Sequence, residues 1–504
     1  MNIGRKVGVT VIYILLALHV AAEKTYSVDS FGAVSDGRTM CTNSIQDAID
    51  QANSDGGGTV IFPKGTYLSG TINMKSNVSL HLANGATLLG SVNPKDYSPM
   101  YNGEYGKLYK WRALILAKNC ENISILGNGI IDGRGGQLSL TIDSLFYAGK
   151  VDSADYNFND KRPKYYLRPQ LIYFYKCKVV NILNINLRNS SCWVQTYERC
   201  HGLNILGVTV ESDAYWNNDG IDIVDSKNVV IRDCNINSSD DGICLKSESK
   251  EVNEFCDSIL IENCKIRSSA SAIKFGMGSL NHMKNISVRN IKVYDTYRSA
   301  VAIEAMQGGV LENILIENIN AKNTGNAIFL RIGRYKNIKN AGVLRNVTIR
   351  NIKVKIPLQN PDYDYNIRGP ELPFFHNVFP SSITGVPGHP IENVTIENIK
   401  IVYPGRGNKA YANMPLDRVE EVPELVTSYP EFSMFGELPA WGFYVRHAEG
   451  ITMNNIKIKI RKPDYRPAMV FDDVKSLKLE NVKIKGDEKP NPIFFNNTIR
   501  VKSN

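Results

Sequence analysis

The sequence predicts an all-β protein built as a parallel β-helix solenoid, and two features of the chain indicate this. From about residue 120 onward one sequence pattern recurs: apolar, any residue, apolar, any residue, Asn or Asp, apolar, any residue, apolar. This alternation, rich in Ile and Val, is typical of short strands that bury one face. The marker residues Asp233, Asn263, Asn290 and Asn318 are 30, 27 and 28 residues apart, which indicates stacked coils of similar length.

The period and the residue types separate this fold from other repeat proteins. A leucine-rich repeat has a similar length, but it would show a leucine template and a helical half, and a propeller would need longer blades. The recurrent Asn falls at the turn between two strands, where its side-chain amide can bond to the backbone and tolerate unusual dihedral angles. We therefore predict a structural role for the Asn positions.

The N-terminus predicts export. Arg5 and Lys6 precede an apolar block, Val7 to Ala22, which ends in small residues and has the form of a secretory signal peptide. An uncleaved membrane anchor is the alternative, but the apolar block is short for a bilayer span. We expect a signal peptide over residues 1–22 and a single β-helix catalytic domain over 23–504. The mature protein would be secreted or periplasmic, with no membrane or nucleic-acid partner.

Composition narrows the class of protein. The 504 residues are 43% hydrophobic and 22% charged, which is typical of a globular chain, and the net charge of +9 mildly favours acidic partners. The nine cysteines include no C-x-x-C pair and are odd in number, unlike a disulfide scaffold or a zinc site. We expect most of them to be small buried side chains.

Four segments depart from the repeat. Residues 43–53 have helical spacing, and this helix can cap the N-terminal end of the solenoid. Residues 151–169 form a predicted surface loop, and two long insertions cover about 355–390 and 402–445. The insertions contain aromatic side chains that would either stack on sugar rings or pack the loops onto the solenoid, among them Phe374, Phe375, Trp441 and Tyr444.

Carboxylates gather in two places, Asn217 to Asp222 and Ser238 to Gly242. Asp219 and Asp240 are 21 residues apart, slightly less than one coil, so Asp219, Asp240 and Asp241 should converge about one strand spacing, ~4.8 Å, apart. Crowded carboxylates shift one another's pKa values, which suits the acid and base of glycoside hydrolysis. From spacing alone, a calcium site or a set of turn aspartates remains open.

These motifs resemble a known family. Asn217-Asn218-Asp219-Gly220 is similar to the Asn-Thr-Asp-Gly motif of glycoside hydrolase family 28, the polygalacturonases and related pectin hydrolases, and Asp240-Asp241-Gly242 follows at that family's spacing. The resemblance implies a right-handed parallel β-helix and hydrolysis with inversion at the anomeric carbon. It implies that Asp240 is the general acid, that Asp219 and Asp241 hold and deprotonate the attacking water, and that no metal or organic cofactor is needed.

Two signatures of that family are missing. Ser271 occupies the position at which the family has the His of Gly-His-Gly. Ala302-Ile303-Glu304 occupies the position of the family's Arg-Ile-Lys, whose two basic residues bind the substrate carboxylate. Glu304 would repel that carboxylate, so either another cation replaces the pair or the sugar in that subsite differs. The candidate substrate-binding residues, any of which could instead be an ordinary turn residue, are Asn217, Lys246, Lys274, Arg298, Arg331 and Tyr335.

The resulting expectation is a secreted hydrolase that cleaves α-linked galacturonate, or a related acidic sugar, in pectin or its side chains. Long loops favour release of terminal residues. The alternatives are hydrolysis of a different glycan, a calcium-dependent lyase on the same scaffold, and a glycan-binding β-helix without catalysis.

Overall fold

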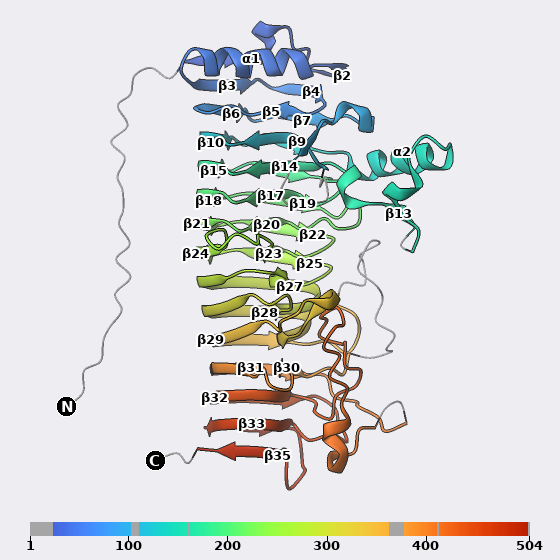
Figure 1. The fold of residues 1–504 in the computed structure, drawn as a ribbon, viewed down its shortest axis with the longest axis vertical. Helices are drawn as coiled ribbons and strands as arrows, with labels where there is room; N and C mark the ends of the chain where they lie inside the picture. Colours follow the sequence, from blue (N-terminus) through green and yellow to red (C-terminus); the bar gives the residue numbers. More distant parts are fainter. Residues whose placement is uncertain (1–23, 102–109, 160, 362–376, 411–412, 502–504) are drawn as a thin grey trace, which may run out of the picture.

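Parallel strands stack into a single β-helix in the computed structural model (Figure 1), which describes residues 24–101, 110–159, 161–361, 377–410 and 413–501. The predicted signal peptide, together with Phe374 and Phe375, lies outside the described residues. The described residues contain no helix with the length and hydropathy that a bilayer crossing requires.

Three parallel sheets form the faces of the β-helix. The first sheet, which carries the candidate site, contains β5 (Ile72–Asn73), β9 (Lys110–Lys118), β14 (Gln170–Tyr175), β17 (Gln195–Glu198), β20 (Ile221–Val224), β23 (Ile243–Ser247), β26 (Ile273–Ser279) and β30 (Ser381–Thr384). The second contains β1 (Thr25–Ser27), β3 (Gly58–Phe62), β6 (Val78–Leu82), β10 (Glu121–Leu126), β15 (Lys178–Leu183), β18 (His201–Leu206), β21 (Lys227–Arg232) and β24 (Cys256–Glu262). The third contains β2 (Asp36–Met40), β4 (Gly65–Ser69), β7 (Ala86–Gly90), β11 (Ile130–Asp132), β16 (Asn186–Arg188), β19 (Thr209–Ser212), β22 (Asn235–Ser238), β25 (Lys265–Ser268) and β34 (Lys483–Lys485).

Later coils bend from one sheet into the next without a break in the strand. These long strands are β27 (Met283–Ala305), β28 (Val310–Ile332), β29 (Val343–Lys355), β31 (Ile391–Tyr403), β32 (Phe443–Ile460), β33 (Met469–Glu480) and β35 (Ile493–Arg500). Two antiparallel pairings lie outside the coils, β8 (Pro99–Tyr101) with β9, and β12 (Tyr156–Asn157) with β13 (Arg162–Pro163). The parallel β-helix predicted from the repeat is confirmed.

Inward side chains stack in columns along the β-helix. In the second sheet Ile261, Val288, Ile316, Ile349 and Ile396 lie opposite one another on successive coils, and all are fully buried. Each such side chain contributes roughly 1.5–3 kcal/mol by leaving water. Alternation then turns the intervening residues outward, which is how the first sheet presents polar groups to the candidate site.

The recurrent Asn residues form a ladder at the turn between the second and third sheets. Asn290, Asn318 and Asn351 adopt left-handed backbone dihedrals, with φ of 58° at each. The side-chain amide of Asn318 donates to Asn290 Oδ1 at 3.0 Å, and that of Asn351 donates to Asn318 Oδ1 at 3.0 Å. The predicted structural role of these residues agrees with this geometry.

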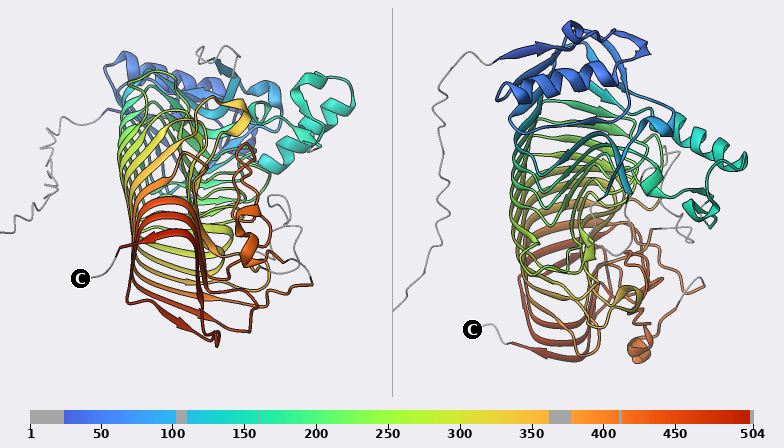
Figure 2. Two further views of the ribbon diagram at one scale, coloured as in Figure 1. Left: turned by 60° about the horizontal axis from the view of Figure 1, so that its bottom comes forward. Right: turned by 45° about the horizontal axis from the view of Figure 1, so that its top comes forward.

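Helices lie at one end and on one side of the β-helix. α1 (Thr42–Ser54) covers the N-terminal end and buries Ile45, Ala48, Ile49 and Ala52, as a capping helix should. α2 (Gly135–Tyr147) projects from the side together with β12 and β13 (Figure 2). Short 3₁₀ turns complete the chain: η1 (Val28–Phe31), η2 (Pro94–Asp96), η3 (Ser153–Asp155), η4 (Tyr165–Leu167), η5 (Tyr335–Asn337) and η6 (Leu416–Glu421).

The insertions differ in part from the sequence prediction. The predicted insertion at 355–390 contains β30, a strand of the first sheet, because Ile383 completes the inward column between Leu330 and Val445. The second insertion joins β31 to β32 and lies on the same side as α2 (Figure 1). Trp441 and Tyr444 are buried, so these two rings pack the structure and do not present a face to a sugar.

All nine cysteines are buried and unpaired, so none forms a disulfide. Their role as small core side chains agrees with the sequence prediction.

The Asn ladder predicts how much the loss of one Asn should lower the free energy of unfolding. Asn318→Ala should lower the free energy of unfolding by about 1–2 kcal/mol, because Ala is strained at positive φ and cannot make the amide bonds. Asn318→Gly should cost less, since Gly tolerates the dihedral angle. Urea unfolding of both variants checks this, and an equal or larger loss for Gly would contradict the strain argument.

Candidate active site

Parallel register brings the three predicted catalytic aspartates together. Asp219 precedes β20, and Asp240 and Asp241 precede β23, while Ile221 pairs with Ile243 on these two strands. The backbone N–H of Gly220 donates to the carbonyl of Asp241 at 2.9 Å. Asp219 is therefore in register with Asp241, 22 residues away, and Asp240 lies beside them. The convergence expected from the sequence is present.

Asp240 is half-buried and is held by two donors. The side-chain amide of Asn217 donates to its Oδ2 at 3.3 Å, and the backbone N–H of Asp241 donates to its Oδ1 at 3.0 Å. Burial raises the pKa of Asp240, and the nearby charge of Asp241 raises it further, whereas Arg298 opposes the shift. A carboxyl group with a raised pKa keeps its proton to higher pH, as a general acid requires.

Asn217 is itself positioned by Arg168, a residue that sequence reasoning missed. Arg168 is fully buried, and its guanidinium donates to Asn217 Oδ1 at 2.8 Å and to the carbonyl of Trp216 at 2.7 Å. It lies near the end of the predicted surface loop 151–169, which therefore reaches into the site. Arg168 and Asn217 are 49 positions apart in the chain, so no local sequence signal pointed to this contact.

Lys246 lies between two buried carboxylates. Its ammonium is 3.1 Å from Asp219 Oδ2, forms an ion pair with Asp222, and lies 3.8 Å from the centre of the Trp193 ring. Asp222 is fully buried and was not among the predicted site residues, although it belongs to the Asn217–Asp222 cluster. Lys246, a predicted substrate-binding residue, therefore lies beside Asp219, and its partners in this structure are carboxylates of the protein.

The two carboxylates and Lys246 shift one another's pKa values. Burial raises the pKa of Asp219 well above its usual range and that of Asp222 to about 6, and Lys246 opposes both shifts. For Lys246, burial disfavours the ammonium, but Asp219 and Asp222 outweigh this and raise its pKa. The ammonium therefore lowers the cost of ionising the two acids.

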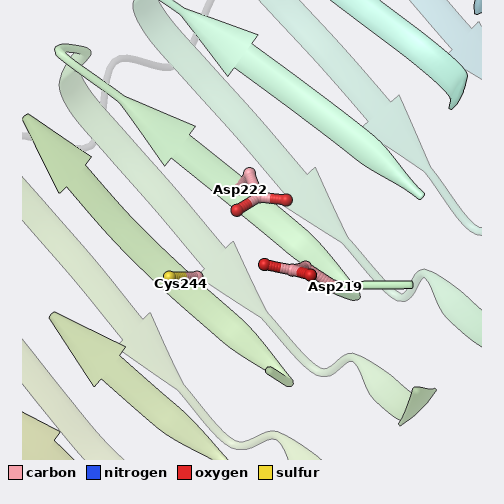
Figure 3. Close-up of side chains that lie close together, drawn as sticks. All are labelled: Asp219, Asp222 and Cys244. Carbon is pink, nitrogen blue, oxygen red and sulfur yellow. The ribbon is translucent and has the colours of Figure 1, made fainter. Parts of the chain in front are cut away.

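The described residues contain one set of side chains with the spacing of a metal site. It consists of Asp219, Asp222 and Cys244, whose potential ligand atoms lie within 4.8 Å of one another (Figure 3). Calcium prefers six to eight oxygen ligands, and this cluster offers two carboxylates and a thiol. Lys246 already supplies a positive charge at both carboxylates. The donor set does not fit calcium.

Asp241 is held from the next coil. The backbone N–H of Ser271 donates to its Oδ1 at 3.0 Å, and the ammonium of Lys274 lies 3.4 Å from its Oδ2. Ser271 therefore takes the place beside the aspartates at which the family resemblance expects a histidine. Lys274 also lies 3.6 Å from Glu304 Oε2, and burial raises the pKa of Glu304 to about 8, with Lys274 opposing.

The second insertion enters the site at Lys274 and Arg298. Glu431 Oε1 lies 2.5 Å from Arg298 Nη1, and the Tyr429 hydroxyl accepts a hydrogen bond from Lys274 at 3.4 Å. Neither Tyr429 nor Glu431 was predicted, because more than 130 residues separate each from its partner.

Arg331 and Tyr335 lie at the edge of this region. The buried guanidinium of Arg331 donates to the backbone carbonyls of Gly385 and Glu424, so it anchors the insertion. Tyr335 is half-buried and packs edge-on against Tyr429, with ring centres 5.9 Å apart. Of the six candidate substrate-binding residues, Asn217, Lys246, Lys274 and Arg298 gather near the aspartates, whereas these two contact the insertion.

Aromatic rings lie on the N-terminal side of Lys246. Trp193, on the coil before Asp219, is half-buried and lies 5.0 Å from the Trp111 ring and 6.3 Å from the Tyr165 ring. Rings of this kind stack on the apolar faces of sugars, and Trp193 touches the lysine that contacts Asp219. A cavity of about 620 Å³ elsewhere, bordered by Lys176, His201 and Asp225, includes none of the predicted site residues.

Comparison with known proteins finds the same family that the sequence motifs resemble. The family model described as glycosyl hydrolases family 28 matches residues 56–420. A probable polygalacturonase of Vitis vinifera is 26% identical over 340 residues, which cover 65% of this chain and 60% of that protein. The aligned region is thus less than two thirds of that relative's length.

Two solved structures are similar in fold. The exopolygalacturonase of Yersinia enterocolitica superposes with a TM-score of 0.61 at 19% identity, covering 95% of this chain and 78% of that chain. An exopolygalacturonase of Thermotoga maritima gives 0.58 at 22% identity, covering 75% of this chain and 87% of that chain.

The Lys246 cluster predicts a pH-dependent loss of stability. Lys246→Met should lower the free energy of unfolding by about 3 kcal/mol near neutral pH, because it leaves two buried carboxylates without their cation. Both carboxyls have raised pKa values in the folded state, so the loss should shrink as the pH falls through about 6 and they become protonated.

Urea unfolding at about pH 7.5 and about pH 4.5 tests this. Lys178→Met, which removes an exposed ion pair with Glu121, is the control and should cost under about 1 kcal/mol at either pH. An equal loss at both pH values for Lys246→Met would show that the carboxylates do not cause it.

Proposed function

Because this chain belongs to glycosyl hydrolases family 28, we propose that it hydrolyses α-linked galacturonate, or a related acidic sugar, in pectin or pectin side chains with inversion at the anomeric carbon. The observation that carries the proposal is the meeting of Asp219, Asp240 and Asp241 on adjacent coils. Their three environments differ, which is what separate acid and base roles require.

Asp240 suits the general acid. It is the most exposed of the three aspartates, and Asn217 holds one of its oxygens. Its raised pKa lets it keep a proton to higher pH, whereas the ion pair with Lys246 opposes the rise in the pKa of Asp219. In the proposed step its proton passes to the glycosidic oxygen as the bond from that oxygen to the anomeric carbon breaks. The leaving chain departs as an alcohol, and Asp240 is left as a carboxylate.

Asp219 and Asp241 suit the water-binding role on the opposite face of the ring. Lys246 favours the ionised form of Asp219, while Ser271 and Lys274 orient the Asp241 carboxylate. In the proposed step a water held by these two carboxylates gives one of them its proton and attacks the anomeric carbon. An inverting enzyme needs room for this water, so its acid and base stand about 6.5–9.5 Å apart.

Action at chain ends is supported by the loops. The second insertion reaches the site through Tyr429 and Glu431, and the segment after α2 reaches it through Arg168. Both project from the same side of the β-helix (Figure 2). Loops in these positions restrict how far a polysaccharide can extend past the site, which favours release of terminal units. The predicted signal peptide supports a secreted or periplasmic location.

The substrate proposal is tested by incubating the purified protein with pectic polysaccharides and oligosaccharides. New reducing ends, inverted product anomers and early release of short products are expected. Rapid loss of viscosity with long products would overturn the chain-end assignment. Ultraviolet absorbance from unsaturated products would identify a lyase and overturn hydrolysis.

The acid assignment is tested by Asp240→Asn. This variant should reduce kcat at least 100-fold, because the side-chain amide is far too weak an acid to protonate the leaving oxygen, while the free energy of unfolding should change by no more than about 1 kcal/mol. Asp233→Asn, at an exposed turn one strand earlier, is the matched control and should keep the wild-type rate. Asp240→Asn with wild-type turnover would remove Asp240 from the mechanism.

A further inference from the structure

The cations near the catalytic aspartates already have partners within the protein. Three cations, Arg298, Lys274 and Lys246, lower the pKa of Asp240 by their charge. Lys246 contacts Asp219 and Asp222, and Lys274 lies within 3.6 Å of Asp241 and Glu304. Arg298 is paired with Glu431 at 2.5 Å.

Carboxyl groups outnumber cations in this region. Six carboxyl groups surround the three cations. Of these, Glu304 lies on the coil after Lys274, and Glu431 reaches Arg298 from the second insertion. A galacturonate carboxylate placed there would enter as a seventh acid and would have to displace Glu304 or Glu431 from a cation. Placing a charge in such a setting without its own counter-ion is costly.

The same region offers an acceptor to an uncharged ligand. Glu304 is 2% exposed, and its Oε2 accepts no hydrogen bond from any residue that the structure describes. A sugar hydroxyl can donate to this oxygen. A hydroxyl can also accept, so it satisfies Glu304 both when the carboxyl is ionised and when it is protonated below its pKa of about 8. An ionised carboxylate can only accept, so it cannot satisfy the ionised form of Glu304.

We propose that the subsite bordered by Lys274, Arg298, Glu304 and Glu431 binds a sugar ring that carries no negative charge. Glu304 and Glu431 are then its specificity-determining residues. This inference rests on the proposed function: the substrate is still a galacturonate-containing chain, but the ring on the Lys274 side of the cleaved bond is uncharged. Two kinds of ring share this chemistry, a neutral sugar and a galacturonate whose carboxyl is esterified.

Three sets of oligosaccharides of matched length test the proposal with the full chain at one pH. They are unesterified oligogalacturonides, their methyl esters, and oligosaccharides in which galacturonate alternates with a neutral sugar. At least one of the two uncharged-ring sets should give a kcat/KM at least about tenfold above the unesterified set. The set that does so identifies the source of the uncharged ring.

The other outcomes separate this inference from the proposed function. Equal or faster hydrolysis of the unesterified set would overturn the uncharged subsite and leave the hydrolase proposal standing. Hydrolysis of none of the three sets would overturn the proposed function itself, and the inference with it.

Glu431→Gln provides an independent test at the residue level. Removing this charge leaves Arg298 available to a substrate carboxylate, so the ratio of kcat/KM for unesterified over methyl-esterified substrate should rise about tenfold. Glu304→Gln should shift the ratio in the same direction through Lys274.

Glu421→Gln, which changes an exposed residue of the same insertion paired with Arg418, is the matched control and should leave the ratio unchanged. A ratio that stays at the wild-type value in both Glu431→Gln and Glu304→Gln would overturn the role of these carboxylates.

Discussion

The register of parallel strands is the constraint on which the rest of this structure depends. Successive coils place equivalent residues about 4.8 Å apart, so every residue type is presented beside its counterpart on the next coil. For Ile and Val this produces a continuous core, and for Asn it produces a ladder of amide bonds. For Asp219 and Asp241 it brings two like charges together, and only the surrounding cations and donors make that arrangement tolerable.

The candidate site is accordingly a network of ion pairs and not a simple acidic patch. Lys246 contacts two carboxylates of the preceding coil, and Lys274 bridges one carboxylate of the preceding coil and one of the next. The contacts that hold the catalytic groups therefore also neutralise the local positive charge. Glu431 does the same for Arg298 from the second insertion. In consequence, the residues that stabilise the aspartates also decide what charge a bound sugar can carry.

Much of this arrangement could be predicted from the sequence, because its cause is local. Period-two alternation and a 28-residue repeat predict the coils, and two acidic clusters nearly one coil apart predict that Asp219, Asp240 and Asp241 meet. Asp222 could have been found by the same alternation, since it is the outward residue between Ile221 and Ile223. The strand β30 was missed because it is short and lies between long irregular segments, where four residues carry little pattern.

By itself, then, the sequence determined the β-helix, its capping helix, its turn ladder and the convergence of three aspartates, since each depends on spacing within one or two coils. Only the tertiary structure decided that Arg168 holds Asn217, that Tyr429 and Glu431 reach the site, and that Lys246, Lys274 and Arg298 are already paired. These contacts join residues on different loops and coils, and no periodicity along the chain encodes where an irregular loop will fold back.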